Sequence, residues 1–274
     1  FACYRLMPAF QSLYNSLSKL KFADKSIKSL HKEIIKTNKN DVFETKNISK
    51  EGVHFRQNIS FEKVKFKYPS SDKENIKNIS VEFIKGSKNG IAGDTGSGKT
   101  TFLNLLIGLF KPSEGEILID GKVLNTSNLN SFREIIGYAA QNTILIDDSI
   151  AANIALSDKY KEINYEKLKE ASDKAEILEF IIKDLPSGFD TRVGQDGIKL
   201  SGGQRQRIGI ARALYNNPDI IFFDEATNAL DKLTEMKVFK NILEKKDITL
   251  FCISHDVNLF KNFDSIIVFE NGTN

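Results

Sequence analysis

The first part of the chain carries hydrophobic residues at alternating intervals of four and three. This spacing places them on one face of an α-helix, so it predicts a helix of about 30 residues. Pro8 lies near its start, where proline can begin or kink a helix. The stripe fits either a coiled coil or the cytoplasmic end of a longer helix that enters a membrane domain. Its members are Leu6, Phe10, Leu13, Leu17, Leu20, Ile27, Leu30 and Ile34.

Residues 36–57 are mostly polar, and we interpret them as a linker. After it, alternating hydrophobic and polar residues predict a strand over 58–66 and a second around 79–83. A short strand at 90–92 leads into a glycine-rich stretch. Further short strands are predicted at 116–119 and 135–138.

Continuous hydrophobic runs at 220–223 and 250–253 are typical of strands buried on both faces, and the run at 266–269 predicts a further strand. Between the strands, helical spacing appears from Phe102 to Leu109, from Ser149 to Lys183, and after Ser201, which suits a helix cap. Strands that alternate with helices predict an α/β fold with a mostly parallel sheet. Ligands bind such sheets at the carboxyl ends of the strands.

Composition and charge limit the possible classes of protein only slightly. The chain has 274 residues, is 41% hydrophobic and 27% charged, and carries a net charge of +3, which does not favour a nucleic-acid partner. No hydrophobic run approaches the roughly 20 residues that cross a bilayer, so we expect a soluble fragment. The two cysteines are expected to be free thiols. The chain starts at Phe1 and stops directly after a predicted strand, so we expect a piece of a longer polypeptide.

The segment from Gly93 to Thr100 reads G-x-x-x-x-G-K-S/T, the phosphate loop pattern. Glycines allow the backbone to wrap closely round a polyphosphate, and the N–H groups of residues 96–99 then form an anion site at a helix N-terminus. Lys99 is expected to reach the β- and γ-phosphates, and the Thr100 hydroxyl to bind Mg²⁺. The alternative is an ordinary glycine-rich turn.

Asp224 and Glu225 follow the hydrophobic run at 220–223. In a fold with a phosphate loop, adjacent carboxylates at a strand end take separate tasks. We expect Asp224 to hold Mg²⁺ and Glu225 to polarise the attacking water. Isolated Asp-Glu pairs are often only solvated, but these two share the chain with Lys99.

Further motifs carry a family resemblance. Residues 200–204 (Leu-Ser-Gly-Gly-Gln) match the signature sequence of the ATP-binding cassette (ABC) family, and residues 224–231 resemble its Walker B and D-loop segment. Gln141 resembles the Q-loop glutamine, His255 the switch histidine, and Tyr68 the aromatic residue that stacks on adenine. The resemblance covers residue 58 to the end.

The resemblance implies a phosphate-loop NTPase (RecA-like) core with an N-terminal antiparallel β subdomain and an α-helical signature subdomain at about 142–205. It implies that two copies enclose two ATP molecules head to tail, each signature turn closing on the other copy's nucleotide. Catalysis falls to Glu225, His255 and Gln141, and the metal to Thr100, Gln141 and Asp224. The predicted nucleotide-binding residues are Tyr68, Gly93, Asp94, Thr95, Gly96, Ser97, Gly98, Lys99, Thr100, Thr101, Ser201, Gly202, Gly203, Gln204 and Asp231.

Residues 191–197 resemble the X-loop of exporter-type members, although Gln195 stands where exporters usually carry Glu. Residues 5–8 and the stripe behind them resemble the last membrane helix of bacterial lipid-linked oligosaccharide flippases. The resemblance therefore implies residues 1–35 as the end of a membrane-domain helix, 36–57 as linker and 58–274 as the ATPase domain. The location implied is the cytoplasmic face of the inner membrane.

The implied cargo is a lipid-linked oligosaccharide, with another lipid, a peptide or a drug as alternatives. The implied partners are a second copy and a transmembrane domain of the same polypeptide, with no nucleic acid. A soluble ABC ATPase acting on DNA or ribosomes would need a coiled-coil insertion or tandem cassettes, and neither is in the sequence. A non-hydrolysing regulator would lack Glu225 or His255, and both are present.

Overall fold

We describe the protein from a computed structural model, which defines residues 2–39, 52–69, 71, 73–156, 163–245, 247–270 and 272–273. The chain divides into two units, Phe1–Ser49 and Lys50–Asn274. Most of the predicted linker at 36–57 lies outside the described residues.

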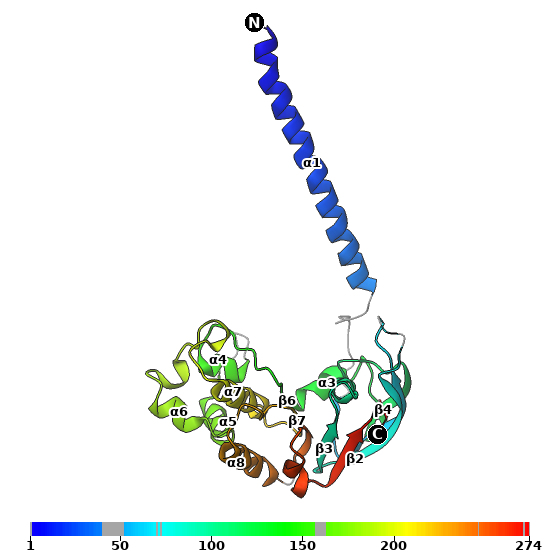
Figure 1. The fold of residues 1–274 in the computed structure, drawn as a ribbon, viewed down its shortest axis with the longest axis vertical. Helices are drawn as coiled ribbons and strands as arrows, with labels where there is room; N and C mark the ends of the chain where they lie inside the picture. Colours follow the sequence, from blue (N-terminus) through cyan, green and yellow to red (C-terminus); the bar gives the residue numbers. More distant parts are fainter. Residues whose placement is uncertain are drawn as a thin grey trace. The chain divides into compact units, whose positions relative to one another are not determined.

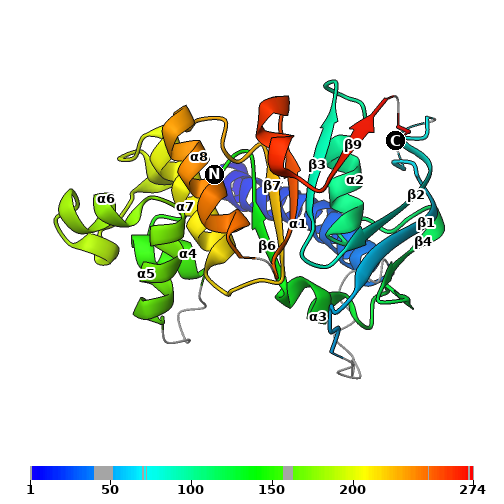
Figure 2. The same ribbon diagram turned by 90° about the horizontal axis from the view of Figure 1, so that it is seen from below.

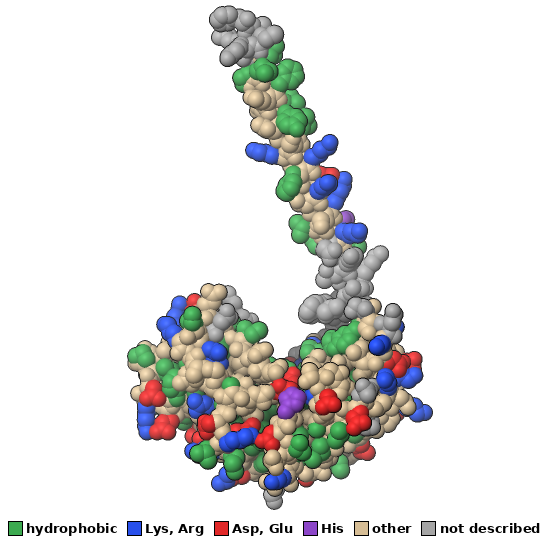
Figure 3. All heavy atoms as spheres, in the orientation of Figure 1, with side chains coloured by type: hydrophobic (Ala, Val, Ile, Leu, Met, Phe, Trp, Pro, Cys, Tyr) green, Lys and Arg blue, Asp and Glu red, His purple; other side chains and the backbone are tan. Residues whose placement is uncertain are grey.

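The first unit is the single helix α1 (Ala2–Lys39), 38 residues long and therefore longer than predicted. It begins before Pro8, which lies inside the helix and does not start it. Every member of the predicted hydrophobic stripe is exposed. Figure 3 shows hydrophobic side chains along the helix, interspersed with Lys and Arg. Within the described residues, no helix combines the length and hydrophobicity needed to span a membrane.

The second unit is built on a five-stranded parallel sheet with the order β6-β7-β8-β3-β9, of which Figure 1 labels β6, β7 and β3. In register, Gly93 lies beside Phe269, Ala139 beside Phe223, and Asp224 beside Ile253. All five carboxyl ends therefore meet at one edge. The strands are β3 (Lys88–Gly93), β6 (Ile136–Ala139), β7 (Ile220–Asp224), β8 (Thr249–Ile253) and β9 (Ser265–Phe269).

A four-stranded antiparallel sheet, of order β2-β1-β4-β5, forms a second layer. Helix α2 (Lys99–Leu106) lies between it and the parallel sheet (Figure 2), and its Phe102 ring centroid is 4.8 Å from that of Phe61 and 5.0 Å from that of Phe269. One hydrophobic core thus joins both sheets through α2. The strands are β1 (Asn58–Phe66), β2 (Ile76–Ile84), β4 (Glu114–Ile119) and β5 (Lys122–Val123).

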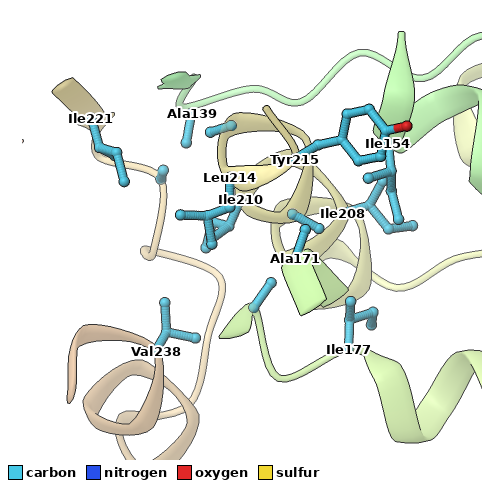
Figure 4. Close-up of a cluster of buried hydrophobic side chains, with 14 of the residues drawn as sticks. Ala139, Ile154, Ala171, Ile177, Ile208, Ile210, Leu214, Tyr215, Ile221 and Val238 are labelled. Carbon is cyan, nitrogen blue, oxygen red and sulfur yellow. The ribbon is translucent and has the colours of Figure 1, made fainter. Parts of the chain in front are cut away.

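The other face of the parallel sheet packs on helices. Side chains alternate along β7, so that Ile220 and Phe222 point into the α2 core while Ile221 and Phe223 join a second core with α7 and α8 (Figure 4). This is why the strand is hydrophobic throughout. The remaining helices are α3 (Leu129–Glu134), α4 (Ile150–Ala155), α5 (Tyr165–Lys174), α6 (Leu178–Lys183), α7 (Gly202–Leu214) and α8 (Lys232–Leu243), with 3₁₀ turns at Gly188–Asp190, Gln195–Gly197 and Val257–Asn262.

The predicted fold class is confirmed, with its parallel core, antiparallel layer and helical part. Two further helix predictions were wrong in extent. The pattern from Ser149 to Lys183 belongs to three helices, α4, α5 and α6, and not to a continuous one. Helix α2 ends at Leu106, because Gly108 takes a φ of +70° and turns the chain, which leaves Leu109 exposed and outside the helix. Helices α3 and α8 were not predicted.

Candidate functional site: a phosphate-binding edge of the parallel sheet

The glycine-rich segment connects β3 to α2 and depends on two glycines. Gly93 has a φ of +140° and Gly98 a φ of +113°, conformations that other residues rarely adopt. A Cβ on Gly93 would lie 2.4 Å from the carbonyl oxygen of Phe269. The loop folds round the Lys99 side chain, whose Nζ donates to the carbonyl oxygens of Gly93 (2.7 Å) and Asp94 (2.8 Å). Sequence alone thus predicted both the loop and its glycines.

Helix α2 begins at the end of this loop, and its cap residue Gly98 provides no side-chain acceptor. The N–H groups of the first turn therefore remain available to an anion, and the helix dipole adds to their effect. Thr100, the second residue of α2, is exposed. Thr101 is buried, and its Oγ1 lies 3.1 Å from the hydroxyl of Tyr68.

Tyr68 stands beside the phosphate loop. Its ring packs edge-on against Phe66 and Phe110, with centroids 5.0 and 5.5 Å away. It lines a hollow of about 410 Å³ that also touches Pro69 and Glu74. Through its contact with Thr101, the Tyr68 ring lies next to the glycine loop. The sequence predicts that the adenine stacks on this ring.

Asp224 ends β7 and is almost fully buried, with 9% of its surface exposed. The Tyr138 hydroxyl, at the end of β6, donates to its Oδ2 at 3.1 Å. Burial raises the pKa of Asp224 and nearby Glu225 raises it further, whereas the Tyr138 hydrogen bond and the positive charge of Lys99 lower it. Sequence reasoning missed Tyr138, because nothing in a four-residue strand marks a tyrosine as a carboxylate partner.

Glu225 lies at the centre of a cluster built from three strand ends. Its Oε2 accepts from Gln141 Nε2 (2.7 Å) and Asn228 Nδ2 (3.0 Å), while Oε1 lies 2.9 Å from His255 Nε2. The backbone of Glu225 has a φ of +51°, an uncommon conformation for a residue with a side chain. The structure therefore brings together the predicted Gln141, Glu225 and His255, and adds Asn228.

The signature segment begins α7. Ser201 Oγ accepts from the Gln204 N–H (3.2 Å), and the Gln204 side chain accepts from the Ser201 N–H (2.8 Å), which together form a capping box. Asp231 caps α8 in a similar way, and the Thr234 hydroxyl lowers the pKa of its carboxyl group. Among the described residues, no hydrogen bond joins the Ser201 turn to the glycine loop.

The oxygen donors near the loop suit Mg²⁺. The described residues contain no cluster of three His, Cys, Asp or Glu side chains that would form a metal cage. Mg²⁺ usually takes only one or two carboxylates and completes its shell with water and substrate phosphates. The buried carboxylate of Asp224, with the Thr100 hydroxyl and the Gln141 amide oxygen, fits that requirement.

The fold and this site define a nucleotide-binding α/β domain of the phosphate-loop class. The profile of one family, described as ABC transporter, matches residues 76–228. The chain belongs to the ABC transporter family.

Curated relatives include proteins that are named for flipping or translocation. The chain is 40% identical over 235 residues to the ATP-dependent lipid A-core flippase of Blochmanniella floridana, covering 85% of this chain and 40% of the relative. It is 42% identical over 215 residues to the alpha-hemolysin translocation ATP-binding protein HlyB of Escherichia coli O157:H7, covering 78% of this chain and 30% of the relative. It thus spans well under half the length of either relative.

A solved structure of a bacterial Atm1-family ABC exporter with ATP bound is also similar. The TM-score is 0.75 at 35% sequence identity, over 81% of this chain and 39% of that one. Both its fold and its family therefore agree with the motifs in the sequence.

Proposed function

We propose that this edge of the sheet binds ATP with Mg²⁺ and hydrolyses it to ADP and phosphate. One observation carries the proposal: the glycine loop, Asp224 and the Glu225 cluster all lie at carboxyl ends of strands in the same parallel sheet. The phosphate-binding loop and the carboxylate that we assign to the attacking water are therefore at the same edge of one sheet.

The residues divide the work. The loop N–H groups and Lys99 hold the phosphates, and Tyr68 stacks on the adenine ring. Glu225 orients the attacking water and accepts its proton, while Gln141 and His255 fix the carboxylate through the contacts described above. When bound at Asp224, Thr100 and Gln141, Mg²⁺ supplies positive charge that balances the phosphate oxygens.

We propose a second copy of the chain as partner. Gly202 and Gly203, which follow the Ser201 cap, present backbone N–H groups at the start of the 13-residue helix α7, a second place suited to a phosphate. Because this turn is not bonded to the glycine loop of its own chain, it is available to a nucleotide on another copy. We assign Gln204 and Asp231 to the same proposed interface.

At the level of the whole polypeptide, we propose an exporter at the cytoplasmic face of the inner membrane, coupled to a transmembrane domain. Its relatives support an export role, since one is named as a lipid A-core flippase and another as a hemolysin translocation protein. The cargo we propose is a lipid-linked oligosaccharide, on the resemblance of residues 5–8 and the helix behind them; another lipid, a peptide or a drug is the alternative.

Phosphate release from Mg–ATP by the purified chain, compared with Glu225→Gln, tests the ATPase. Cargo is tested by reconstituting the full polypeptide in vesicles and following ATP-dependent movement of labelled lipid-linked glycan, with a lipid and a peptide as competing cargoes. Movement of none of them, with ATPase activity intact, would favour an ABC ATPase without a transport role.

A further inference from the structure

One face of α7 contacts two of the three loops that supply the catalytic cluster. We call residues 141–146 the glutamine loop and residues 225–231 the carboxylate loop. Gly203, Gln206 and Gly209 are spaced three apart on α7 and therefore line one side of the helix. A Cβ on Gly203 would lie 3.0 Å from the backbone oxygen of Ala229, in the carboxylate loop.

The third member of this face meets the other loop. A Cβ on Gly209 would lie 2.3 Å from Thr143 Oγ1, so only glycine allows α7 to approach the glutamine loop this closely. Further along the helix, the Arg212 guanidinium donates to the carbonyl oxygen of Ile144 at 3.1 Å. The helix thus holds the glutamine loop at several points.

Gln206, between the two glycines, bonds to both loops. Its Oε1 accepts from the Ala229 N–H at 2.8 Å, and its Nε2 donates to the carbonyl oxygen of Gln141 at 3.5 Å. The side chain is buried, with 8% of its surface exposed. An amide is suited to this place, because it offers an acceptor to one loop and a donor to the other.

The contacts close into a ring. Gln206 holds the backbone of Gln141, the Gln141 side chain donates to Glu225, and Glu225 begins the loop whose Ala229 returns to Gln206. Asn228 of the same loop also donates to Glu225. A displacement of either loop against α7 would therefore alter the contact between Gln141 and the carboxylate.

We propose that Gln206 is a positioning residue, which sets the distance between the glutamine loop and the carboxylate loop and so keeps Gln141 on Glu225. This inference rests on the proposed ATPase function. Because α7 begins with the signature turn, Gln206 also links engagement of that turn to the geometry of the catalytic cluster.

The test compares Gln206→Met, which has similar length but no hydrogen bonds, with Gln206→Glu, which keeps the acceptor for Ala229 and loses the donor to Gln141. Asn241→Leu is the control, because the Asn241 amide joins α8 to Lys174 and Glu176, away from both loops. Steady-state ATP hydrolysis, thermal melting and amide hydrogen exchange are measured on each purified chain.

For Gln206→Met we expect kcat to fall about 10-fold to 100-fold, because a small misplacement of catalytic groups costs that much, while KM for ATP stays within about twofold. The Ala229 amide should exchange faster. In Gln206→Glu the Ala229 amide should stay protected, residues 141–146 should exchange faster, and kcat should again fall. Asn241→Leu should melt at lower temperature with kcat unchanged.

Unchanged kcat in the folded Gln206 variants would overturn the inference. So would a fall in kcat that Asn241→Leu also shows when its melting temperature is lowered by the same amount. If Gln206→Met does not fold, Gln206→Glu decides on the same criteria. Should the unsubstituted chain fail to hydrolyse ATP, the proposed function falls. Hydrogen exchange then tests the role of Gln206 separately. If the Ala229 amide stays protected in Gln206→Met, the proposed role of Gln206 is refuted.

Discussion

The substitution Glu225→Gln tests the catalytic cluster most directly, because it removes a charge and keeps the shape. A glutamine oxygen at the Oε2 position still accepts from Gln141 and Asn228. Its amide nitrogen then faces His255 Nε2, which accepts a hydrogen bond when the ring is neutral. We therefore expect the free energy of unfolding to change by no more than about 1 kcal/mol, the net value of an ordinary hydrogen bond.

The effect on catalysis should be far larger. Glu225 is the carboxylate that we assign to the attacking water, and 15% of its side chain is exposed, so it acts in a site with little solvent. Loss of one preorganised transition-state contact typically costs about 2.7–4 kcal/mol of barrier, or about 10²–10³ in kcat. ATP affinity should stay near the unsubstituted value, since the phosphates are held by other residues.

The measurement is phosphate release at saturating Mg–ATP, together with equilibrium binding of ATP and gel filtration with and without nucleotide. We expect Glu225→Gln to elute as an ATP-dependent dimer, because the bound nucleotide is not consumed. Glu244→Gln is the matched control. It makes the same chemical change at an exposed residue at the end of α8, whose Oε1 lies 4.0 Å from Lys240 Nζ.

Hydrolysis by Glu225→Gln at the rate of the Glu244→Gln control would refute the assignment of the water-activating role. An equal loss of ATP binding in Glu225→Gln would show instead that the substitution disturbs the phosphate loop.

Three further substitutions test other parts of the site. Lys99→Ala removes the ammonium that bonds Gly93 and Asp94, and should weaken ATP binding in equilibrium titrations; unchanged affinity would contradict the phosphate-loop assignment. Tyr138→Phe removes a hydrogen bond that lowers the pKa of Asp224, so that pKa should rise and the acid limb of the pH–rate profile should move to higher pH; an unmoved limb would exclude Asp224 as its source. Gly93→Ala forces a φ of +140° on alanine and a clash with Phe269, which should cost about 1–3 kcal/mol or more of stability in a denaturant titration; an unchanged midpoint would mean that the loop relaxes freely.

The catalytic edge was predictable because its strands carry strong local signals. Residues 220–223 are hydrophobic without interruption, since β7 is buried on both faces, and polar residues begin where that strand ends. The order of the strands was not predictable. Neighbours such as β8 and β3 are far apart in sequence, and hydrophobicity does not reveal which strand pairs with which.

The helical region shows a different limit. Helices α5 and α6 share the three-to-four spacing of one continuous helix, but Glu176 between them takes a φ of +56° and turns the chain. Asn164 caps α5 through hydrogen bonds to the next residues, a start signal within the supposed helix. Tertiary packing of Leu168 and Ile181 into one core preserves the spacing across the break.

Gln206 could not be singled out from sequence, since a glutamine in a polar run next to arginines resembles any exposed helical residue. Its importance comes from two loops that approach α7 in space from sequence positions on either side of it.

The order of the parallel sheet has one more consequence. Glycine loop and carboxylate pair emerge from β3 and β7, which are not neighbours but are separated by the single strand β8. Two strand spacings amount to about 10 Å, a distance that backbone hydrogen bonding imposes. No individual side chain can increase or decrease that distance. Sequence changes among related proteins would therefore leave the spacing of these two strands unchanged and would act on the parts of the protein outside this sheet.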